Sequence, residues 1–124
     1  MREIKFRYRV DQGYFRGDRV IATFIFTIDQ IEERNGEYNA VLENYKIVSR
    51  NLFTGLKDKN GKEIYEGDIC SMKSFDTYVK GEVRYQPPEF CLRTANDYWE
   101  LDYGDPAYIE IKIIGNIYEN PELL

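Results

Sequence analysis

Hydrophobic and polar residues alternate strictly at the start of the chain. From Glu3 to Val10 every second residue, beginning with Ile4, is apolar or aromatic, and the residues between them are charged. Because successive side chains of a strand point to opposite faces, this alternation predicts a half-buried strand with a charged outer face. The next apolar run, Val20–Ile28, is interrupted only by threonine and predicts a second strand, buried in the core.

Turn residues and a less regular stretch follow these two strands. Asp11-Gln12-Gly13 and Gly17-Asp18 predict two turns, and Asn35-Gly36 predicts a tight hairpin turn. Residues 37–50 fit either a helix or a strand. Four residues at helical spacing favour the helix: Tyr38, Val41, Leu42 and Tyr45. A strand around Tyr45–Val48 is the alternative, and we expect a strand after the turn.

The second half of the chain alternates short apolar stretches with polar turns. Five strands are predicted: Ile69–Phe75, Val79–Tyr85, Phe90–Thr94, Tyr98–Tyr103 and Tyr108–Tyr118, with Gly81 at a bulge or bend. Short strands with turns about every ten residues are typical of a barrel or sandwich. We therefore expect a mainly β fold in one domain, residues 1–124. Residues 52–118 would form a barrel core, 1–50 would add strands to it, and 29–50 are the least defined part.

Composition adds an expectation about self-association. The 124 residues include 15% aromatics, eleven of them tyrosine, and tyrosine favours strands. Nineteen aromatic residues are more than one small core buries, so several tyrosines should lie at the surface, where tyrosine is an efficient contact residue. Short strands also leave exposed edges. The sequence therefore predicts self-association through strand edges or aromatic faces.

Charge and apolar length bear on compartment and partners. The net charge is -5, with a balance of +2 over residues 1–60 and -7 over residues 61–124. An acidic half repels phosphate backbones, so we expect weak binding to duplex DNA. No apolar run reaches the roughly 18 residues of a membrane span, and the N-terminus has no signal core. We expect a cytoplasmic protein without membrane association. Cys70 and Cys91 should be free thiols there, although a disulfide between them stays open.

Little in the sequence points to catalysis or a cofactor. The chain has no histidine, which removes the commonest general base and metal ligand. No nucleotide-binding fingerprint is present, and we expect no enzyme, no metal and no cofactor. The remaining candidates are carboxylates close together in one stretch: Asp97, Glu100, Asp102 and Asp105. They could hold Ca²⁺ or Mg²⁺, but a solvated acidic face is the interpretation we favour. Trp99 in the same stretch is expected in the core, or in an interface with Tyr98 and Tyr103.

Three segments carry a resemblance to a known family. They are Met1–Arg7 at the start, Phe53–Ile69 in the middle and Ile114–Leu123 at the end, and the middle segment, FTGLKDKNGKEIYEGDI, is the most specific. Together they resemble the YopX family of bacteriophage and prophage proteins. The resemblance implies a small phage protein with an SH3-like barrel and no established biochemical activity.

The middle segment has both an architectural and a functional interpretation. Its glycines and aspartates are typical of tight turns, and Gly67 should adopt a backbone conformation that is costly for other residues. The alternative is a candidate interaction loop, made of Lys57, Asp58, Lys59, Asn60 and Lys62. We favour architecture.

These expectations combine into three functional hypotheses. The first is a non-enzymatic interaction protein that contacts a host or phage protein in the cytoplasm of the bacterial host. The second is a nucleic-acid-associated protein that uses the 57–62 loop and the basic N-terminal residues, which are Lys5, Arg7, Arg9, Arg16 and Arg19. We expect those residues to pair with acidic groups of the second half instead. The third, a carboxylate-dependent enzyme, has the least support.

Overall fold

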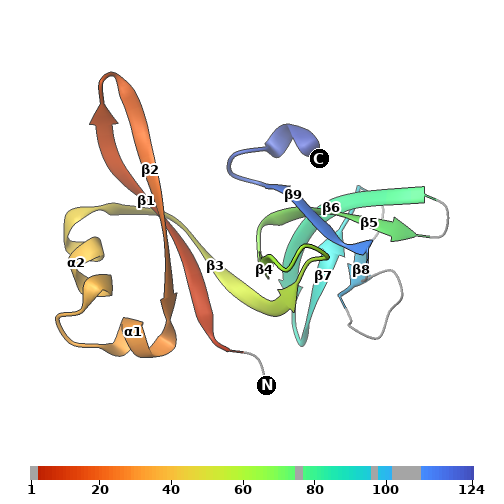
Figure 1. Cartoon of the computed structure of the whole chain (residues 1–124), viewed down its shortest axis with the longest axis horizontal. Coiled ribbons are helices and arrows are strands. Elements are labelled where there is room, and N and C mark those ends of the chain that lie inside the picture. Colours follow the sequence, from red (N-terminus) through yellow and green to blue (C-terminus); the bar gives the residue numbers. More distant parts are fainter. Residues whose placement is uncertain (1–2, 75–76, 96–97, 102–109) are drawn as a thin grey trace. The chain divides into compact units, whose positions relative to one another are not determined.

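The chain folds into two compact units, residues 1–53 and 54–124 (Figure 1). The computed structural model describes residues 3–74, 77–95, 98–101 and 110–124. Most of the described secondary structure is strand, so the expectation of a mainly β fold is confirmed. The twelve-residue strand β3 (Lys46–Lys57) runs from the first unit into the second.

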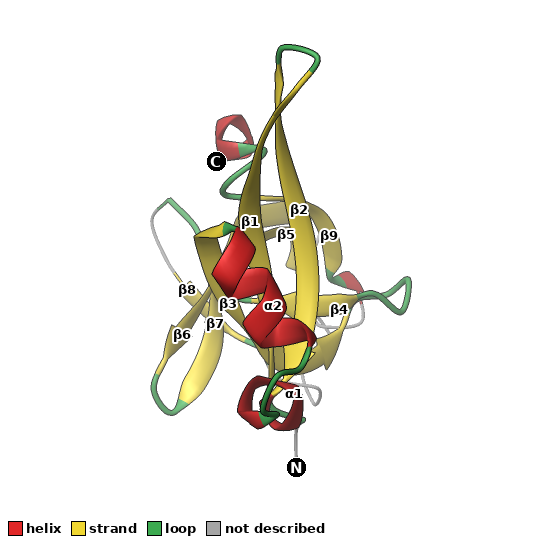
Figure 2. Cartoon of the chain, turned by 90° about the vertical axis from the view of Figure 1, so that its left-hand side faces the viewer, coloured by secondary structure: helices red, strands yellow, loops and turns green. Residues whose placement is uncertain are grey.

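The first unit is a long hairpin covered by two helices. Strand β1 (Lys5–Phe15) pairs antiparallel with β2 (Asp18–Thr27) on one side and with β3 on the other. Helices α1 (Ile28–Glu32) and α2 (Glu37–Asn44) cover one face of this sheet (Figure 2). The core between them contains Tyr8, Val10, Phe26 and Val41. Tyr8 and Val10 are inward positions of the predicted alternation, as expected, but Ile4 is 48% exposed and Arg9, which the pattern placed on the charged outer face, is only 5% exposed.

The hairpin expected at Asn35-Gly36 is wrong, because two helices occupy this region. Thr27 begins α1 with a reciprocal cap: its hydroxyl accepts from the Gln30 amide at 3.2 Å, and the Gln30 side chain accepts from the Thr27 amide at 2.8 Å. Asn35, with a φ of 61°, lies in the connection between the two helices, and Gly36 is the N-cap of α2. Residues 37–44 are therefore the helix that we considered and did not favour, and the strand begins at Lys46.

Asp11-Gln12-Gly13 is an irregularity inside β1 and not the turn that the sequence predicted. The register with β2 shifts between Asp11 and Tyr14, where one extra residue is accommodated. Gly13 has a φ of 85°, which is typical of the glycine in a β-bulge. The chain reverses only at Arg16-Gly17.

The second unit contains a five-stranded antiparallel sheet in the order β8-β7-β6-β5-β9 over the described residues. Its strands are β5 (Asp68–Ser74), β6 (Thr77–Gln86), β7 (Glu89–Arg93), β8 (Tyr98–Glu100) and β9 (Lys112–Asn116). The short β4 (Glu63–Tyr65) joins the β2-β1-β3 sheet, and a 3-10 helix covers Pro121–Leu123. The core cluster consists of Leu56, Ile64, Cys70, Met72, Val83, Leu92 and Ile111.

Gly81 is needed for close packing and not for a bulge. The pairing of β5 with β6 passes through Cys70–Gly81 without a shift in register. A Cβ added at Gly81 would lie 2.3 Å from the Arg93 carbonyl oxygen. Any side chain there would push β7 away, so the glycine allows the two segments to approach each other.

Candidate functional site

The 57–62 loop is organised around one carboxylate. Asp58 Oδ1 accepts hydrogen bonds from the amides of Asn60 and Lys62, both at 2.9 Å, and Oδ2 accepts from the amide of Ile113 in β9 at 3.0 Å. Asp58 is only 6% exposed. Burial alone would raise its pKa, but the amides that donate to the carboxylate hold the pKa below its ordinary value.

The other residues of this candidate loop remain at the surface. Lys57, Lys59, Asn60 and Lys62 are exposed, and the Lys59 amide donates to the Ile111 carbonyl at 2.9 Å. The loop therefore presents lysines from a backbone that is fixed to the second unit. Asp58 faces inward and supports the loop, so it offers no oxygen to a partner.

The candidate interface residues around Trp99 are only partly described. Trp99 is half-buried and packs against the core cluster of the second unit, as a core residue would. Tyr103 and the side chain of Tyr98 lie outside the described residues. The structure therefore brings Trp99 to the core and does not place the other two side chains.

The carboxylate hypothesis rests on Glu100, since Asp97, Asp102 and Asp105 lie outside the described residues. Glu100 lines a shallow cavity of about 230 Å³ with Glu89 and Cys91. The described part of the chain holds no cluster of three metal-ligating side chains. A larger cavity of about 450 Å³ is lined by residues that include Lys80, Arg84 and Arg93.

Both cysteines are free, buried thiols. Cys70 belongs to the core of the second unit, and burial raises its pKa. Burial also raises the pKa of Cys91, against the effect of the neighbouring Arg84 and Arg93. A thiol with a raised pKa stays protonated at neutral pH and is a poor nucleophile. Neither cysteine has the environment of a reactive site.

The basic N-terminal residues are partly engaged within the first half of the chain. Lys5 pairs with Glu3 at 3.5 Å, and its ammonium lies 4.7 Å from the centre of the Phe53 ring. Arg19 pairs with Asp11 of the first half and not with an acidic group of the second half as expected, and Arg9 is only 5% exposed. Arg16 and Arg19 are exposed near the turn of the β1–β2 hairpin while Arg9 is buried in the middle of β1, so the buried Arg9 interrupts the basic face that the sequence predicted.

The tip of the β1–β2 hairpin, residues 13–18, is the most exposed aromatic feature that we identify. Tyr14 is 75% exposed and Phe15 is 65% exposed. The chain reverses through Arg16 at a φ of 52° and Gly17 at 86°, the positive values that a two-residue type I′ hairpin turn requires. Figure 1 shows this tip extending beyond α2. The aromatic rings are therefore presented to solvent from a tight, regular turn.

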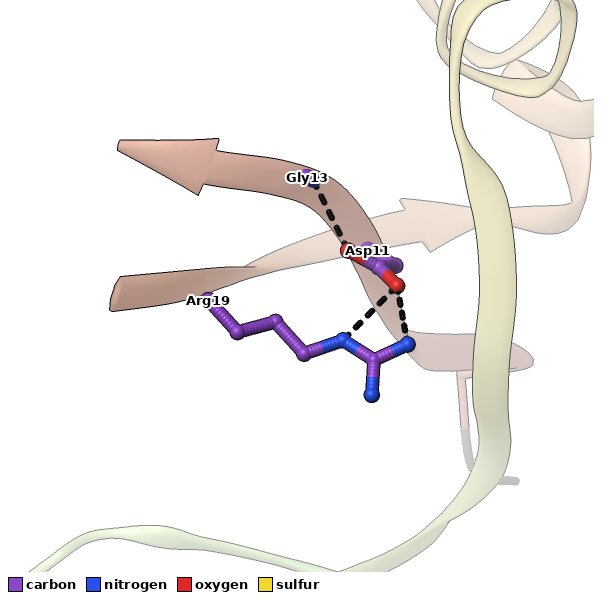
Figure 3. A network of polar contacts seen from close by, with 3 residues as sticks. All are labelled: Asp11, Gly13 and Arg19. Carbon is purple, nitrogen blue, oxygen red and sulfur yellow. Dashed lines mark hydrogen bonds and ion pairs between the residues drawn. The ribbon is translucent and has the colours of Figure 1, made fainter. Parts of the chain in front are cut away.

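Asp11 holds the base of the hairpin tip together (Figure 3). Its Oδ1 accepts from the Gly13 amide at 2.8 Å, and its Oδ2 accepts from Arg19 Nε at 2.9 Å and also from Arg19 Nη2. Arg19 and the Gly13 amide lower the pKa of Asp11, so the carboxylate stays ionised at neutral pH. One side chain thus fixes the bulge of β1 and ties it to β2.

Sequence reasoning missed the tip as a site, because it placed two turns there with an unassigned stretch between them. A strand pattern continued across Asp11–Gly13 would have placed Tyr14 and Phe15 next to the Arg16-Gly17 turn. Two aromatic residues beside a hairpin turn cannot both reach a core, since neighbouring side chains point to opposite faces. The two aromatic residues next to the turn were therefore the feature of the sequence that could have identified the tip as an exposed site.

Comparison with known proteins identifies a family. A family model described as YopX protein matches residues 14–124. No curated protein matches the sequence. Among solved structures, the crystal structure of protein EF1440 from Enterococcus faecalis is similar, with 23% identity, a TM-score of 0.49, and coverage of 100% of this chain and 99% of that one.

Proposed function

The chain belongs to the YopX protein family, and from this premise we propose that it is a non-enzymatic interaction protein of phage origin. It would act in the cytoplasm of the bacterial host by binding a host or phage protein. The second unit would serve as an SH3-like barrel, as expected for residues 52–118. Its sequential antiparallel strands β5, β6, β7 and β8, with β9 returning beside β5, support that fold.

The hairpin tip is the observation that carries this proposal. Tyr14 and Phe15 are large side chains left in water, which is unfavourable unless a partner covers them. Tyrosine, phenylalanine and arginine are enriched in protein interfaces. Arg16 lies with its guanidinium carbon 5.3 Å from the centre of the Phe15 ring, so Phe15 and Arg16 offer an aromatic and cationic surface, and Tyr14 offers a second aromatic contact on the other face of the hairpin.

The backbone of the tip also favours a functional role. Arg16 has a φ of 52°, a conformation that asparagine or glycine adopts at lower cost. An arginine at this position lowers stability and adds a charge next to two exposed rings. Outliers of this kind are often retained for function.

Site-specific photocrosslinking in bacterial cells tests the proposal. A benzophenone amino acid replaces Tyr14 in one variant and Phe15 in a second. A third variant carries it at Tyr78, which is 66% exposed and lies at the start of β6 in the second unit. We expect a discrete adduct with another protein from positions 14 and 15, and none from position 78.

The same positions then test affinity for the captured partner. Replacing Tyr14 and Phe15 together by serine should weaken binding about thirtyfold, which corresponds to about 2 kcal/mol for a hot spot. Tyr78→Ser should leave the affinity unchanged. Equal adducts from all three positions, or no adducts, would count against an interface at the tip.

A second candidate function, association with nucleic acid, is supported by the 57–62 loop. Lys57, Lys59 and Lys62 are exposed on a loop that Asp58 fixes in place, and lysines of this kind contact phosphates. Three lysines can neutralise only a few phosphates, so this function ranks second.

A further inference from the structure

Among the residues that the structure describes, strand β2 pairs with another strand along one of its long sides only. It stands at the end of the strand order β2-β1-β3-β4, and in the described part of the chain its only strand neighbour is β1. At ten residues it is long for an edge strand, and edge strands offer a row of unpaired backbone groups to any further strand.

The register with β1 shows which residues face this free side. The Ile28 amide donates to the Ile4 carbonyl at 3.1 Å, so Ile4 and Ile28 form a hydrogen-bonded pair. This pair lies two residues along the ladder from the pair Phe6–Phe26. In an antiparallel pair, hydrogen-bonded positions alternate with positions whose backbone groups point away. The alternating residues Ile21, Thr23 and Ile25 therefore direct their amides and carbonyls to the free side of β2.

The side chains on this edge are apolar or uncharged. Ile21 is 42% exposed and Ile25 is 46% exposed, with the exposed Thr23 between them, so β2 is an edge strand and not the strand buried in the core that the sequence predicted. From Val20 to Ile28 there is no charged residue, proline or glycine. Natural edge strands are usually protected from further pairing by lysine, proline, a bulge or short length, and this segment of β2 has none of these features.

The opposite side of the first unit is better protected. Ile47 and Val48 in β3 are also exposed, but Lys46 and Arg50 flank them. The pairing of β1 with β3 also shifts in register between Arg9 and Val10, which bends the strand. Charges and an irregular backbone both disfavour strand addition there, so β2 is the edge open to a further strand.

We propose that β2 pairs antiparallel with β2 of a second copy of this chain, around a two-fold axis at Thr23. This arrangement places Thr23 opposite Thr23 of the second copy and Ile21 opposite Ile25. On the other face it places Ala22 opposite Phe24. Each pair is uncharged, the same patch serves both copies, and the symmetry closes at a dimer.

The charged residues of this arrangement lie at its two ends. In the same register the turn residue Arg16 of one copy comes beside the first turn of α1 in the other copy. That turn carries Asp29. Asp18, which faces Ile28 in this register, lies between Arg16 and Arg19, so each end combines two arginines and one aspartate beside Asp29 while the centre is uncharged. A strand from an unrelated protein would need to reproduce this pattern, whereas a second copy has it already.

A pair of charged variants at the axis tests the proposal. Thr23→Lys places two lysines opposite each other, and Thr23→Glu places two glutamates there. Like charges directly opposite destabilise strand pairing, so each variant alone should raise the dimer dissociation constant about tenfold or more. Mixing the two variants should restore a dimer, because lysine then faces glutamate. Val48→Lys on β3 is the matched control and should leave the dimer intact.

The readout is molar mass by light scattering over a dilution series, with circular dichroism to confirm that each variant is folded. Wild-type protein should show twice the 14.8 kDa of one chain at micromolar concentration. A wild-type mass that stays monomeric would overturn the proposal. So would a Thr23→Lys variant that remains dimeric, or folded single variants that fail to pair when mixed. In the photocrosslinking experiment the mass of the adduct separates the two proposals, because an adduct of two copies of this chain would report the dimer and an adduct with a different protein would report the partner, so either proposal can fail alone.

Discussion

At the scale of single residues, Asp58 links the pH of the solution to the stability of the second unit. Its folded-state pKa is lowered by the amides that donate to it, while the unfolded chain has an ordinary pKa of about 3.9. The ionised carboxylate therefore contributes stability above that value. This contribution is lost as the pH falls through the lower folded-state pKa.

We expect Asp58→Asn to reduce the free energy of unfolding by about 2 kcal/mol at pH 7. The cost arises because an amide cannot accept from three donors as a carboxylate does. The difference between variant and wild type should shrink on acidification below about pH 4. Urea unfolding followed by the fluorescence of Trp99, the single tryptophan, measures it. A difference that is constant from pH 7 to pH 3 would contradict the role assigned to the charge.

Gly67 is a second residue whose role can be measured directly. Its φ is 89°, which confirms the expected left-handed backbone at the Glu66-Gly67-Asp68 turn. Its amide donates to the Val83 carbonyl at 2.8 Å, and its carbonyl accepts from the Ile117 amide at 2.9 Å. The turn therefore cannot relax without breaking bonds to two other segments.

Gly67→Val should lower the free energy of unfolding by about 1–3 kcal/mol through backbone strain. Gly67→Asn should lower it less, since asparagine tolerates positive φ better. Both variants are compared by the same Trp99 fluorescence. Equal losses for valine and asparagine would show that side-chain size, and not the backbone angle, sets the cost.

At the scale of elements, the β1–β2 hairpin combines a strained turn with an exposed surface. Arg16→Asn places a residue that tolerates positive φ at this position, and we expect it to stabilise the first unit by about 1 kcal/mol. The same change removes the cation beside Phe15 and should weaken partner binding. Thermal unfolding by circular dichroism measures the change in stability. Titration with the partner protein that photocrosslinking identifies measures the change in binding.

Arg19→Asn is the control for this variant, because it also replaces an arginine of the hairpin but at an ordinary strand position. It should not stabilise the unit, since it removes the ion pair with Asp11. If Arg16→Asn leaves stability unchanged, the turn carries no measurable strain. Backbone strain would then give no reason to assign a function to the tip.

The sequence predicted a helix or strand correctly where short-range patterns of residues specify it. The first part of strand β1 followed from alternation, although the strand continues to Phe15 through the predicted turn, and β5 and β6 followed to within a few residues from short apolar stretches between turns. Helix α2 did not, because its apolar spacing competed with a strong turn dipeptide at Asn35-Gly36. The Thr27–Gln30 cap was visible as a Thr-x-x-Gln spacing, but the apolar run around it favoured a continuing strand.

The candidate sites followed from sequence only in part. The turn chemistry of Asp58 and Gly67 is local, so residue types and spacing were enough to predict it. The third donor to Asp58 is Ile113, fifty-five positions away, and no local pattern contains that contact. The hairpin tip had a local signal in Tyr14 and Phe15 beside the turn, whereas the free edge of β2 depends on which strands pair and emerged only from the sheet order.

At the scale of the whole molecule, the two units differ in charge. Residues 1–53 hold nine lysines and arginines against eight acidic residues, while residues 54–124 hold eight against fourteen. In the described ranges no helix is long and apolar enough to cross a membrane. The acidic unit also carries the lysine loop, so any phosphate that approaches the loop meets a net repulsion from the same unit.

We therefore expect weak binding to duplex DNA at about 0.15 M salt, with a dissociation constant well above micromolar. A gel-shift series at several salt concentrations measures both affinity and its salt dependence. If the 57–62 loop supplies the contacts that exist, replacing Lys57, Lys59 and Lys62 by alanine should reduce the slope of log affinity against log salt. The reduction should approach about 0.9 for each phosphate that the variant no longer neutralises.

Replacing Lys80, which lies outside the loop, is the control and should leave the slope unchanged. A submicromolar affinity that falls steeply with salt and disappears in the triple variant would place nucleic-acid association ahead of protein binding as the function. The attraction of the three lysines for phosphate would then outweigh the net negative charge of the unit that carries them.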